Sequence, residues 1–212
     1  MYPASWIRWA DARGAVVLLD LRTAQYVALG AHASAMWRAV LANPVAMHGE
    51  LAAFAERCLE RGYLQRDAPS LAAPAREFRA ARGLLAWSAW WALSATSRRL
   101  ARAGFSETYR RNAALAKPRG VPEGKLVERA QRAFLLAENA FVARRSLGAE
   151  PRDCLPRSLA LHRFLLGAGI AADHVIGVTM YPFSAHAWVE CRGVAVCDAT
   201  EDVRHYTEIA RL

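Results

Sequence analysis

The sequence of 212 residues predicts an α+β protein in three parts. Three short strand-like runs and two helical patterns fill residues 1–67, a long helical stretch follows, and a helix with three more strand-like runs ends the chain. Apolar residues make up 54% of the composition and charged residues 22%, which is enough for a packed core. The C-terminal helix followed by an antiparallel sheet is what sets the fold class.

The first part begins with three predicted strands. Trp6–Ala10 is the first, and Ala15–Leu21, rich in valine and leucine, is the second. A polar turn at Arg22–Ala24 leads into the third, Gln25–Leu29. Two such runs joined by a short polar turn are typical of a β-hairpin.

Two predicted helices follow these strands. Apolar residues recur at helical spacing in Ala31–Leu41 and again in Glu50–Arg61. Asn43–Pro44 separates the two helices, because proline cannot continue a helix, and Gly62 ends the second one as a C′ glycine. Strands, helix, break and helix form a winged-helix-like unit, and we assign residues 1–67 to one domain.

The middle of the chain, residues 76–146, is predicted to be helical with a break at 117–124. Residues 68–75 contain two prolines and predict a linker, so we assign 68–120 to a linker and a helical connecting segment. An apolar stripe at helical spacing consists of Leu84, Trp87, Trp90, Trp91 and Ser94. We expect this stripe to be buried between the two ends of the chain, with a membrane-surface role as the alternative.

Residues 121–212 are assigned to a C-terminal domain. Its first helix, Val127–Ala143, should bury Phe134, Leu135, Ala137 and Phe141. A second helix runs from Cys154 to Leu166. The strands that follow are His174–Met180, Ser184–Cys191 and Val194–Ala199.

The net charge of +9 is concentrated in the middle of the chain. Residues 1–75 carry 7 basic and 6 acidic side chains, residues 76–145 carry 15 and 5, and residues 146–212 carry 6 and 8. Affinity for DNA depends mainly on neutralising phosphates, so the nearly neutral winged-helix-like unit is not expected to bind DNA tightly. Nucleic acid is therefore not the expected partner, although weak, salt-sensitive DNA binding through the central arginines remains an alternative.

The four cysteines form no CxxC pair, so we expect no structural zinc site, and we expect no metal or other cofactor. The N-terminus shows no secretory signal, which predicts a cytoplasmic protein. The longest uncharged run, Gly83–Ser97, has 15 residues. A spanning helix needs about 20, so stable membrane insertion is not expected.

Cys154 is the candidate nucleophile. Pro156 is tolerated only in the first turn of a helix, which places Cys154 at or just before the helix start. Free backbone amides and the helix dipole favour an anion there, and a thiolate is such an anion. The same amides could hold an oxyanion.

His186 and Asp198 are the candidate partners of this thiol. If Cys191–Gly193 forms a three-residue loop with glycine in the left-handed position, His186 lies opposite Asp198 on one face of the sheet. Opposed residues have Cβ atoms about 5 Å apart. A two-residue turn would place them on opposite faces. The glycine favours the first register, in which a carboxylate orients an imidazole that deprotonates a thiol.

The segments CLPRSLALHRFLLGAGI, VIGV, FSAHAWVE and CDA resemble the transglutaminase-like cysteine protease domain of lasso-peptide B proteins, which are leader peptidases. The order Cys, His, Asp is that of the family. Residues 1–67 also resemble the peptide-recognition domain of these proteins, through VVLLDLRTAQYVAL, Met36–Trp37 and the helix that ends in ERGYL.

The resemblance implies a substrate, a mode of binding and a partner. The substrate would be a ribosomally made precursor peptide, whose leader adds as a strand beside Gln25–Leu29 and against Glu50–Arg61. The implied leader-binding residues are Tyr26, Val27, Phe54 and Cys58. Cys154, His186 and Asp198 would cut the leader from the core without ATP of their own. An asparagine-synthetase-like, ATP-using cyclase would then join the freed amine to an acidic side chain.

Other functions stay open on the sequence alone. A non-catalytic scaffold would deliver a peptide to another enzyme and leave Cys154 inert. A transglutaminase would use the same three residues with an amine as acceptor. The third alternative is the nucleic-acid-binding winged-helix protein considered above.

Overall fold

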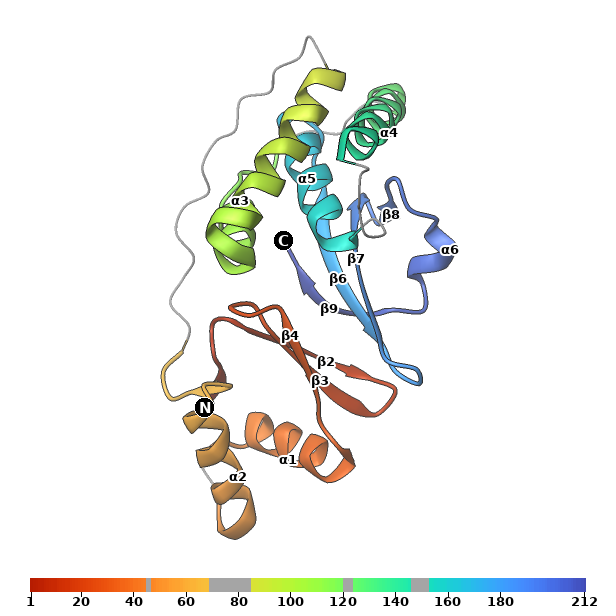
Figure 1. Cartoon of the computed structure of the whole chain (residues 1–212). Helices are drawn as coiled ribbons and strands as arrows, with labels where there is room; N and C mark the ends of the chain where they lie inside the picture. The colour runs from red at the N-terminus through yellow and green to blue at the C-terminus, as the bar shows by residue number, and fades with distance from the viewer. Residues whose placement is uncertain (45–46, 69–84, 120–123, 146–152) are drawn as a thin grey trace.

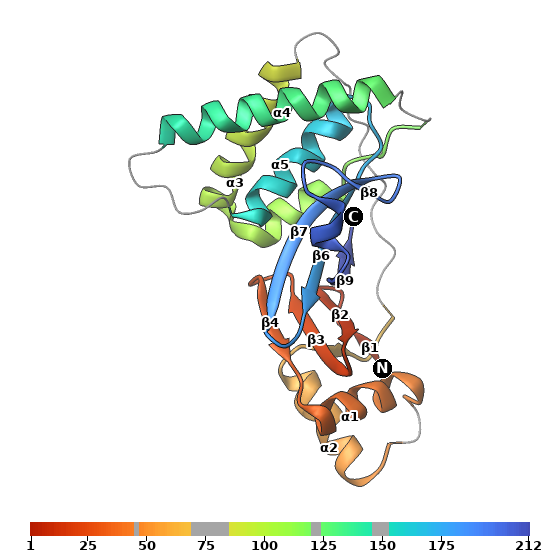
Figure 2. The ribbon, with the colours of Figure 1, turned by 90° about the vertical axis from the view of Figure 1, so that its right-hand side faces the viewer.

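The computed structural model describes residues 1–44, 47–68, 85–119, 124–145 and 153–212. They form two lobes stacked end to end (Figures 1 and 2). The lobe at the bottom of Figure 1 contains β1 Tyr2–Pro3, β2 Ile7–Ala12, β3 Ala15–Asp20, β4 Gln25–Ala28, α1 Ala31–Ala42, α2 Gly49–Glu60 and β5 Leu64–Gln65. The other lobe contains α3 Leu85–Ala113, α4 Gly124–Arg145, α5 Cys154–Gly167, β6 Asp173–Thr179, β7 Ser184–Cys191, β8 Val194–Ala195, α6 Thr200–Val203 and β9 Thr207–Arg211.

The sheet of the N-terminal lobe has the order β2-β3-β4, and β3 is covered on both faces. Val16 and Leu18 pack on one side against Trp37 of α1 and its neighbours from α2. Val17 and Leu19 point to the other side. Burial of both faces explains why β3 reads as an almost continuous apolar run rather than an alternating one. The predicted strands and helices of this lobe are confirmed to within one or two residues, and Gly62 takes the expected left-handed conformation with φ 71°.

The C-terminal lobe has an antiparallel sheet of order β8-β7-β6-β9, and α5 packs on one face of it. The helices α3 and α4 pack on α5, so that all three share one core with β7. The α+β class with mixed helix and sheet is therefore confirmed. The strand predicted over Val194–Ala199 was too long, since β8 ends at Ala195, and β9 was not predicted.

The two lobes share a second core. Val17 and Leu19 of β3 lie in one apolar cluster with Leu159 of α5, Ile176 of β6 and Ile209 of β9. At the tip of the β2–β3 hairpin, Arg13 donates a hydrogen bond of 3.3 Å to the carbonyl of Met180. One face of the N-terminal sheet is thus packed against the C-terminal lobe that carries the candidate site, which fixes its position relative to that site.

The prediction that the tryptophan stripe is buried is wrong for two of its members. Trp87 is 62% exposed and Trp91 is 52% exposed, whereas Trp90 packs edge-on against Phe141 of α4 at 5.3 Å. The buried stripe of α3 is instead the neighbouring one: Ala89, Ala92, Leu93 and Thr96. Small side chains let α3 approach the other helices closely, so the wide indoles are displaced to its flank. Leu84 and the predicted linker after residue 68 lie outside the described residues.

The predicted inner face of α4 needs a smaller correction. Phe134 and Ala137 are buried as expected, but Leu135 is exposed, as is Leu136 beside it.

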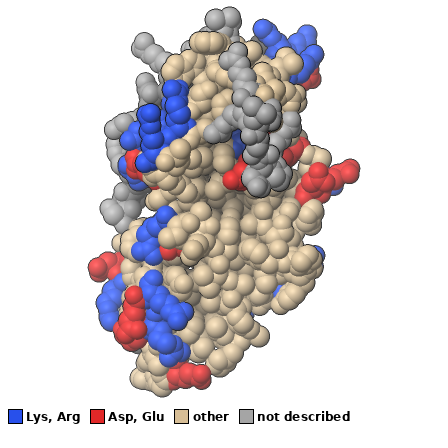
Figure 3. Space-filling view, viewed as in Figure 1, with Lys and Arg blue, Asp and Glu red and all other residues tan. Residues whose placement is uncertain are grey.

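Basic side chains gather along the edge of the molecule over α3 and α2, at the left of Figure 3. Among the helices in the described ranges, none is both long and apolar enough to cross a bilayer.

Candidate active site

Cys154 is the first residue of α5, as predicted. Asp153 caps the helix, because its Oδ1 accepts a hydrogen bond of 3.2 Å from the backbone N–H of Leu155. The thiol is free and partly buried. Its place at the helix start leaves the thiol among amides that have no partner within the helix.

His186 lies in β7, and its ring is held by two aromatic neighbours. It stacks on Trp188 with 6.1 Å between the ring centroids and contacts Tyr206 at 5.6 Å. Gly177 of β6 pairs with His186 in the sheet, and a Cβ added there would meet Trp188 at 2.7 Å and Tyr206 at 2.8 Å. Glycine is therefore needed at position 177, so that these two rings can lie over β6 and support the imidazole.

Asp198 lies beside His186, with 3.7 Å between its Oδ1 and the histidine Nε2. This is an ion-pair distance, longer than a hydrogen bond. Asp198 and then the thiol of Cys154 raise the pKa of His186 to about 9, against an opposing effect of burial. The imidazole is therefore charged at neutral pH. Because Nε2 faces the carboxylate, Nδ1 is the nitrogen left to exchange a proton with the thiol.

The structure brings Cys154, His186 and Asp198 together, but not through the predicted register. The β7–β8 connection is a two-residue turn, in which Arg192 and Gly193 have φ 56° and 76°. Glu190 pairs with Ala195 and Cys191 with Val194, so a regular continuation would place Asp198 opposite Ala187, on the wrong face. The strand does not continue: Cys197 takes φ 62°, and this left-handed residue turns the chain so that Asp198 reaches His186.

A residue that the sequence reasoning missed completes the cluster. Arg157, one turn along α5 from Cys154, donates from Nη1 to both carboxylate oxygens of Asp198, at 3.2 and 3.1 Å. Its Nε donates to Glu138 of α4 at 2.8 Å, and its Nη2 to the carbonyl of Cys197 at 2.8 Å. The one sequence signal was its i+3 spacing from Cys154, which places both on adjoining faces of the helix.

Comparison with known proteins finds a matching family and a matching relative. Residues 86–211 match the profile of the "Transglutaminase-like superfamily". The chain belongs to the transglutaminase-like superfamily. A stretch of 47 residues is 49% identical to the "Microcin J25-processing protein McjB" of Escherichia coli. That match covers 22% of this chain and 23% of the relative, so less than a quarter of the relative's length is spanned. No solved structure matches significantly.

The superfamily match covers most of the C-terminal lobe, and the relative that matches over the shorter stretch is named for the processing of microcin J25. The superfamily match begins at residue 86 and so includes α3, which the sequence reasoning placed in the connecting segment. This agrees with the packing of α3 on α4 and α5 in one core.

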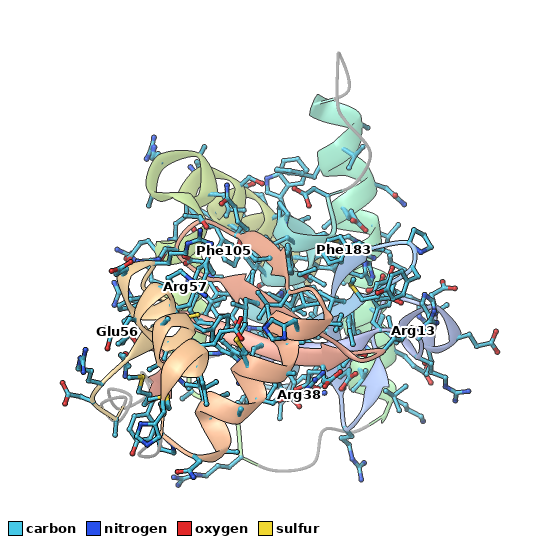
Figure 4. All side chains as sticks on the ribbon, turned by 90° about the horizontal axis from the view of Figure 1, so that it is seen from below. Arg13, Arg38, Glu56, Arg57, Phe105 and Phe183 are labelled. Carbon is cyan, nitrogen blue, oxygen red and sulfur yellow. The ribbon has the colours of Figure 1, made fainter. Side chains whose placement is uncertain are left out.

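The structure separates the four predicted leader-binding residues into two pairs. Phe54 and Cys58 are buried in the core of the N-terminal lobe, whereas Tyr26 and Val27 of β4 are partly exposed. Tyr26 also lies close to the thiol: burial and then Cys154 raise its pKa to about 12. Its ring packs against Phe183 of the β6–β7 connection at 5.7 Å, and Phe183 lies beside the N-terminal sheet in Figure 4. The leader role of all four residues stays a prediction.

Burial sets the other cysteines of the transglutaminase-like chain apart from Cys154. It raises the pKa of Cys191 to about 11 and that of Cys197 to about 12, and it also raises the pKa of Cys58. These three side chains therefore remain thiols at neutral pH, which makes them poor nucleophiles.

Two buried histidines, His162 on α5 and His174 in β6, give a testable prediction for stability. Burial lowers the pKa of His162 to about 4, and it lowers that of His174 as well. Both are ordinary histidines in the unfolded chain, which therefore binds protons that the folded chain does not as the pH falls below about 6.5. We expect His162 alone to reduce the free energy of unfolding by about 2 kcal/mol between pH 7 and pH 5.

Urea unfolding at these two pH values measures the effect. The window ends at pH 5 because the paired carboxylates titrate below it. His162→Leu should lose part of the pH dependence, and His32→Ala, which changes an exposed surface histidine, should keep all of it. If the free energy of unfolding changed equally between the two pH values for wild type and His162→Leu, the pKa of His162 would not be lowered in the folded state.

Proposed function

We propose that this chain is a cysteine peptidase that cuts the leader from a ribosomally made precursor peptide during lasso-peptide maturation. The observation that carries the proposal is the assembly of Cys154, His186 and Asp198 at the start of α5, beside the outer strand of the N-terminal sheet. A free thiol at a helix start, a charged imidazole and a carboxylate are the parts that acyl transfer requires.

The proposed mechanism has two halves. The Cys154 sulfur attacks the scissile carbonyl carbon, and the backbone N–H of Cys154 donates to the oxygen on which negative charge develops. His186 then protonates the leaving amine, which belongs to the core peptide. In the second half, His186 takes a proton from water, which attacks the acyl-enzyme and releases the leader acid. Asp198 stabilises the imidazolium throughout.

The N-terminal lobe offers the place for the leader. β4 is an outer strand in the order β2-β3-β4, and in the described ranges no strand pairs with its free side. An extended peptide can add to such an edge through main-chain hydrogen bonds. Because Tyr26 of β4 is close to Cys154, a leader bound along this edge is already near the thiol. The core peptide would then pass to an asparagine-synthetase-like, ATP-using cyclase as partner.

Mass spectrometry of the candidate precursor, incubated with the purified protein, tests the reaction class. We expect two fragments whose summed mass exceeds that of the precursor by one water. Added amine, such as a lysine-containing peptide, should not appear in either fragment. Intact precursor joined to the amine with loss of ammonia would instead identify a transglutaminase. An unmodified, uncut precursor that binds normally would indicate a delivery scaffold or a peptidase that needs its cyclase.

The raised pKa of His186 predicts the pH dependence of cleavage. The imidazolium is present below pH 9 and is lost above it, so kcat/KM should fall with a midpoint at about pH 9. Asp198 is the largest cause of the shift, and Asp198→Asn should therefore move this midpoint downward, toward the ordinary value of about 6.5. A midpoint that does not respond to Asp198→Asn would contradict the proposed pairing.

A further inference from the structure

Little of the backbone around Asp198 is held by the sheet. Regular pairing of β8 with β7 ends at Ala195, and one further bond follows, from the N–H of Val196 to the carbonyl of Val189 at 2.8 Å. After it, Cys197 leaves strand geometry altogether. The position of the Asp198 carboxylate must therefore be set by side-chain contacts.

Arg157 supplies those contacts. Its guanidinium binds both oxygens of Asp198 and also the carbonyl of Cys197, the residue just before it. It thus fixes the carboxylate and the backbone that carries it. Arg157 lies on the same helix as Cys154, so one rigid element positions the thiol and the partner of the histidine.

Glu138 holds Arg157 from the other side. It accepts a hydrogen bond of 2.8 Å from Nε and is 4% exposed, while the side chain of Arg157 is 13% exposed. Because the guanidinium is planar and presents its N–H groups in a fixed fork, binding Glu138 at Nε sets the direction in which Nη1 and Nη2 point. Buried ion pairs contribute little net stability, since their desolvation is costly, so stability alone does not account for this arrangement.

We propose that Arg157 is a positioning residue that holds Asp198 against His186, with Glu138 fixing the orientation of its guanidinium. The proposal deepens the proposed function and rests on it, because it assigns Arg157 a role in the same site. Next to the thiol of Cys154, four groups in successive contact alternate in charge: the imidazolium of His186, Asp198, Arg157 and Glu138. Tyr206 is the other titratable side chain against the His186 ring.

The test is a double-mutant cycle of Arg157→Met and Asp198→Asn. The readout is the rate at which iodoacetamide alkylates Cys154, mapped by mass spectrometry between pH 5 and pH 10. This readout needs no peptidase activity, so it stands even if no precursor is cut. If Arg157 acts through Asp198, each single variant should slow alkylation at pH 7 by about tenfold, because the imidazolium that supports the thiolate is lost near neutral pH.

The double variant decides between roles. We expect it to react no more slowly than Asp198→Asn alone, because removing Arg157 has no further effect once Asp198 is gone. Additive slowing in the double variant, or an unchanged alkylation profile in Arg157→Met, would overturn the proposal. Arg157→Lys keeps the charge but cannot span both carboxylates, and it should fall between wild type and Arg157→Met.

Two controls keep the test independent of folding. Arg157→Met removes a charged partner from Glu138 and from Asp198, so the pair Arg157→Met and Glu138→Gln is made as well, to relieve the buried carboxylate of Glu138. Arg163→Met removes a similarly buried arginine from the same helix and should lower the unfolding midpoint without changing the alkylation profile. With precursor as substrate, Arg157→Met should lower kcat by about 10²-fold and leave KM unchanged, as a misplaced catalytic group does.

Discussion

Cys154→Ala should abolish cleavage of the precursor while leaving leader affinity unchanged. The sulfur forms the covalent bond to the scissile carbonyl, and no other cysteine can replace it, because burial keeps Cys58, Cys191 and Cys197 in the thiol form. We expect a loss of at least ~10³-fold in kcat. Affinity should be unchanged because a deleted sulfur atom removes no contact with the β4 edge.

The matched control for this variant is Cys191→Ala. It makes the same chemical change at a buried thiol in β7 and should retain cleavage, at a small cost in stability. Cleavage is measured by mass spectrometry and leader affinity by fluorescence anisotropy of a labelled leader peptide. Residual cleavage by Cys154→Ala at more than a few per cent of the wild-type rate would rule out a covalent mechanism at this residue.

His186→Ala should be almost as damaging to turnover. The imidazolium protonates the leaving amine, and the imidazole then takes a proton from the attacking water, so its loss should lower kcat by ~10³-fold or more. Leader affinity should again be retained, because His186 lies in β7 and not on β4. His32→Ala, an exposed histidine of α1 that pairs with Glu50, is the control and should behave as wild type.

The pattern of losses separates catalysis from structure. If His186→Ala also weakened leader binding, or lowered the unfolding midpoint strongly, the histidine would be a structural residue packed between Trp188 and Tyr206. Thermal unfolding of each variant, recorded beside the kinetic measurements, distinguishes these cases. Unchanged turnover in His186→Ala would refute its assignment as the general base.

The helix start and its thiol were predictable because local chemistry determines them. Pro156 restricts the first turn, Asp153 caps it, and both act within a few residues of Cys154. Most of the strands were predictable for the same reason, since short apolar runs and turn residues are local signals. The strand β9, which pairs with β6, was not predicted, because its sequence TEIAR has only two buried residues and so gives a weak strand signal.

The meeting of His186 with Asp198 was predicted correctly on the wrong grounds. The sequence cannot distinguish a three-residue loop from a two-residue turn when a glycine ends both, and the structure has the two-residue turn. Contact is restored by the left-handed Cys197, a conformation that nothing in the residue type foretells. Arg157 was missed for a related reason: its partners, Glu138 and Asp198, lie 19 and 41 residues away along the chain.

The tryptophan stripe shows how a helical pattern can mislead. Two adjacent stripes of α3 satisfy the same spacing. The prediction chose the stripe with the large aromatic side chains, which is not the one that packs in the core. The stripe that packs is made mainly of alanines, which carry a weak hydrophobic signal but allow close helix contact. Which of two offset faces turns inward depends on α4 and α5, and not on α3 alone.

The apolar cluster shared by the two lobes has a consequence for how this protein can be assembled. Because β3 packs against α5, β6 and β9, the lobes are held together by their own surfaces rather than by the covalent connection between them. Cutting the chain between residues 68 and 85 should therefore yield two polypeptides that recombine into a working heterodimer. Either piece alone would expose an apolar sheet face to water and aggregate. Removing the N-terminal lobe is thus a poor way to test leader binding, and co-expression of the two halves is the better one.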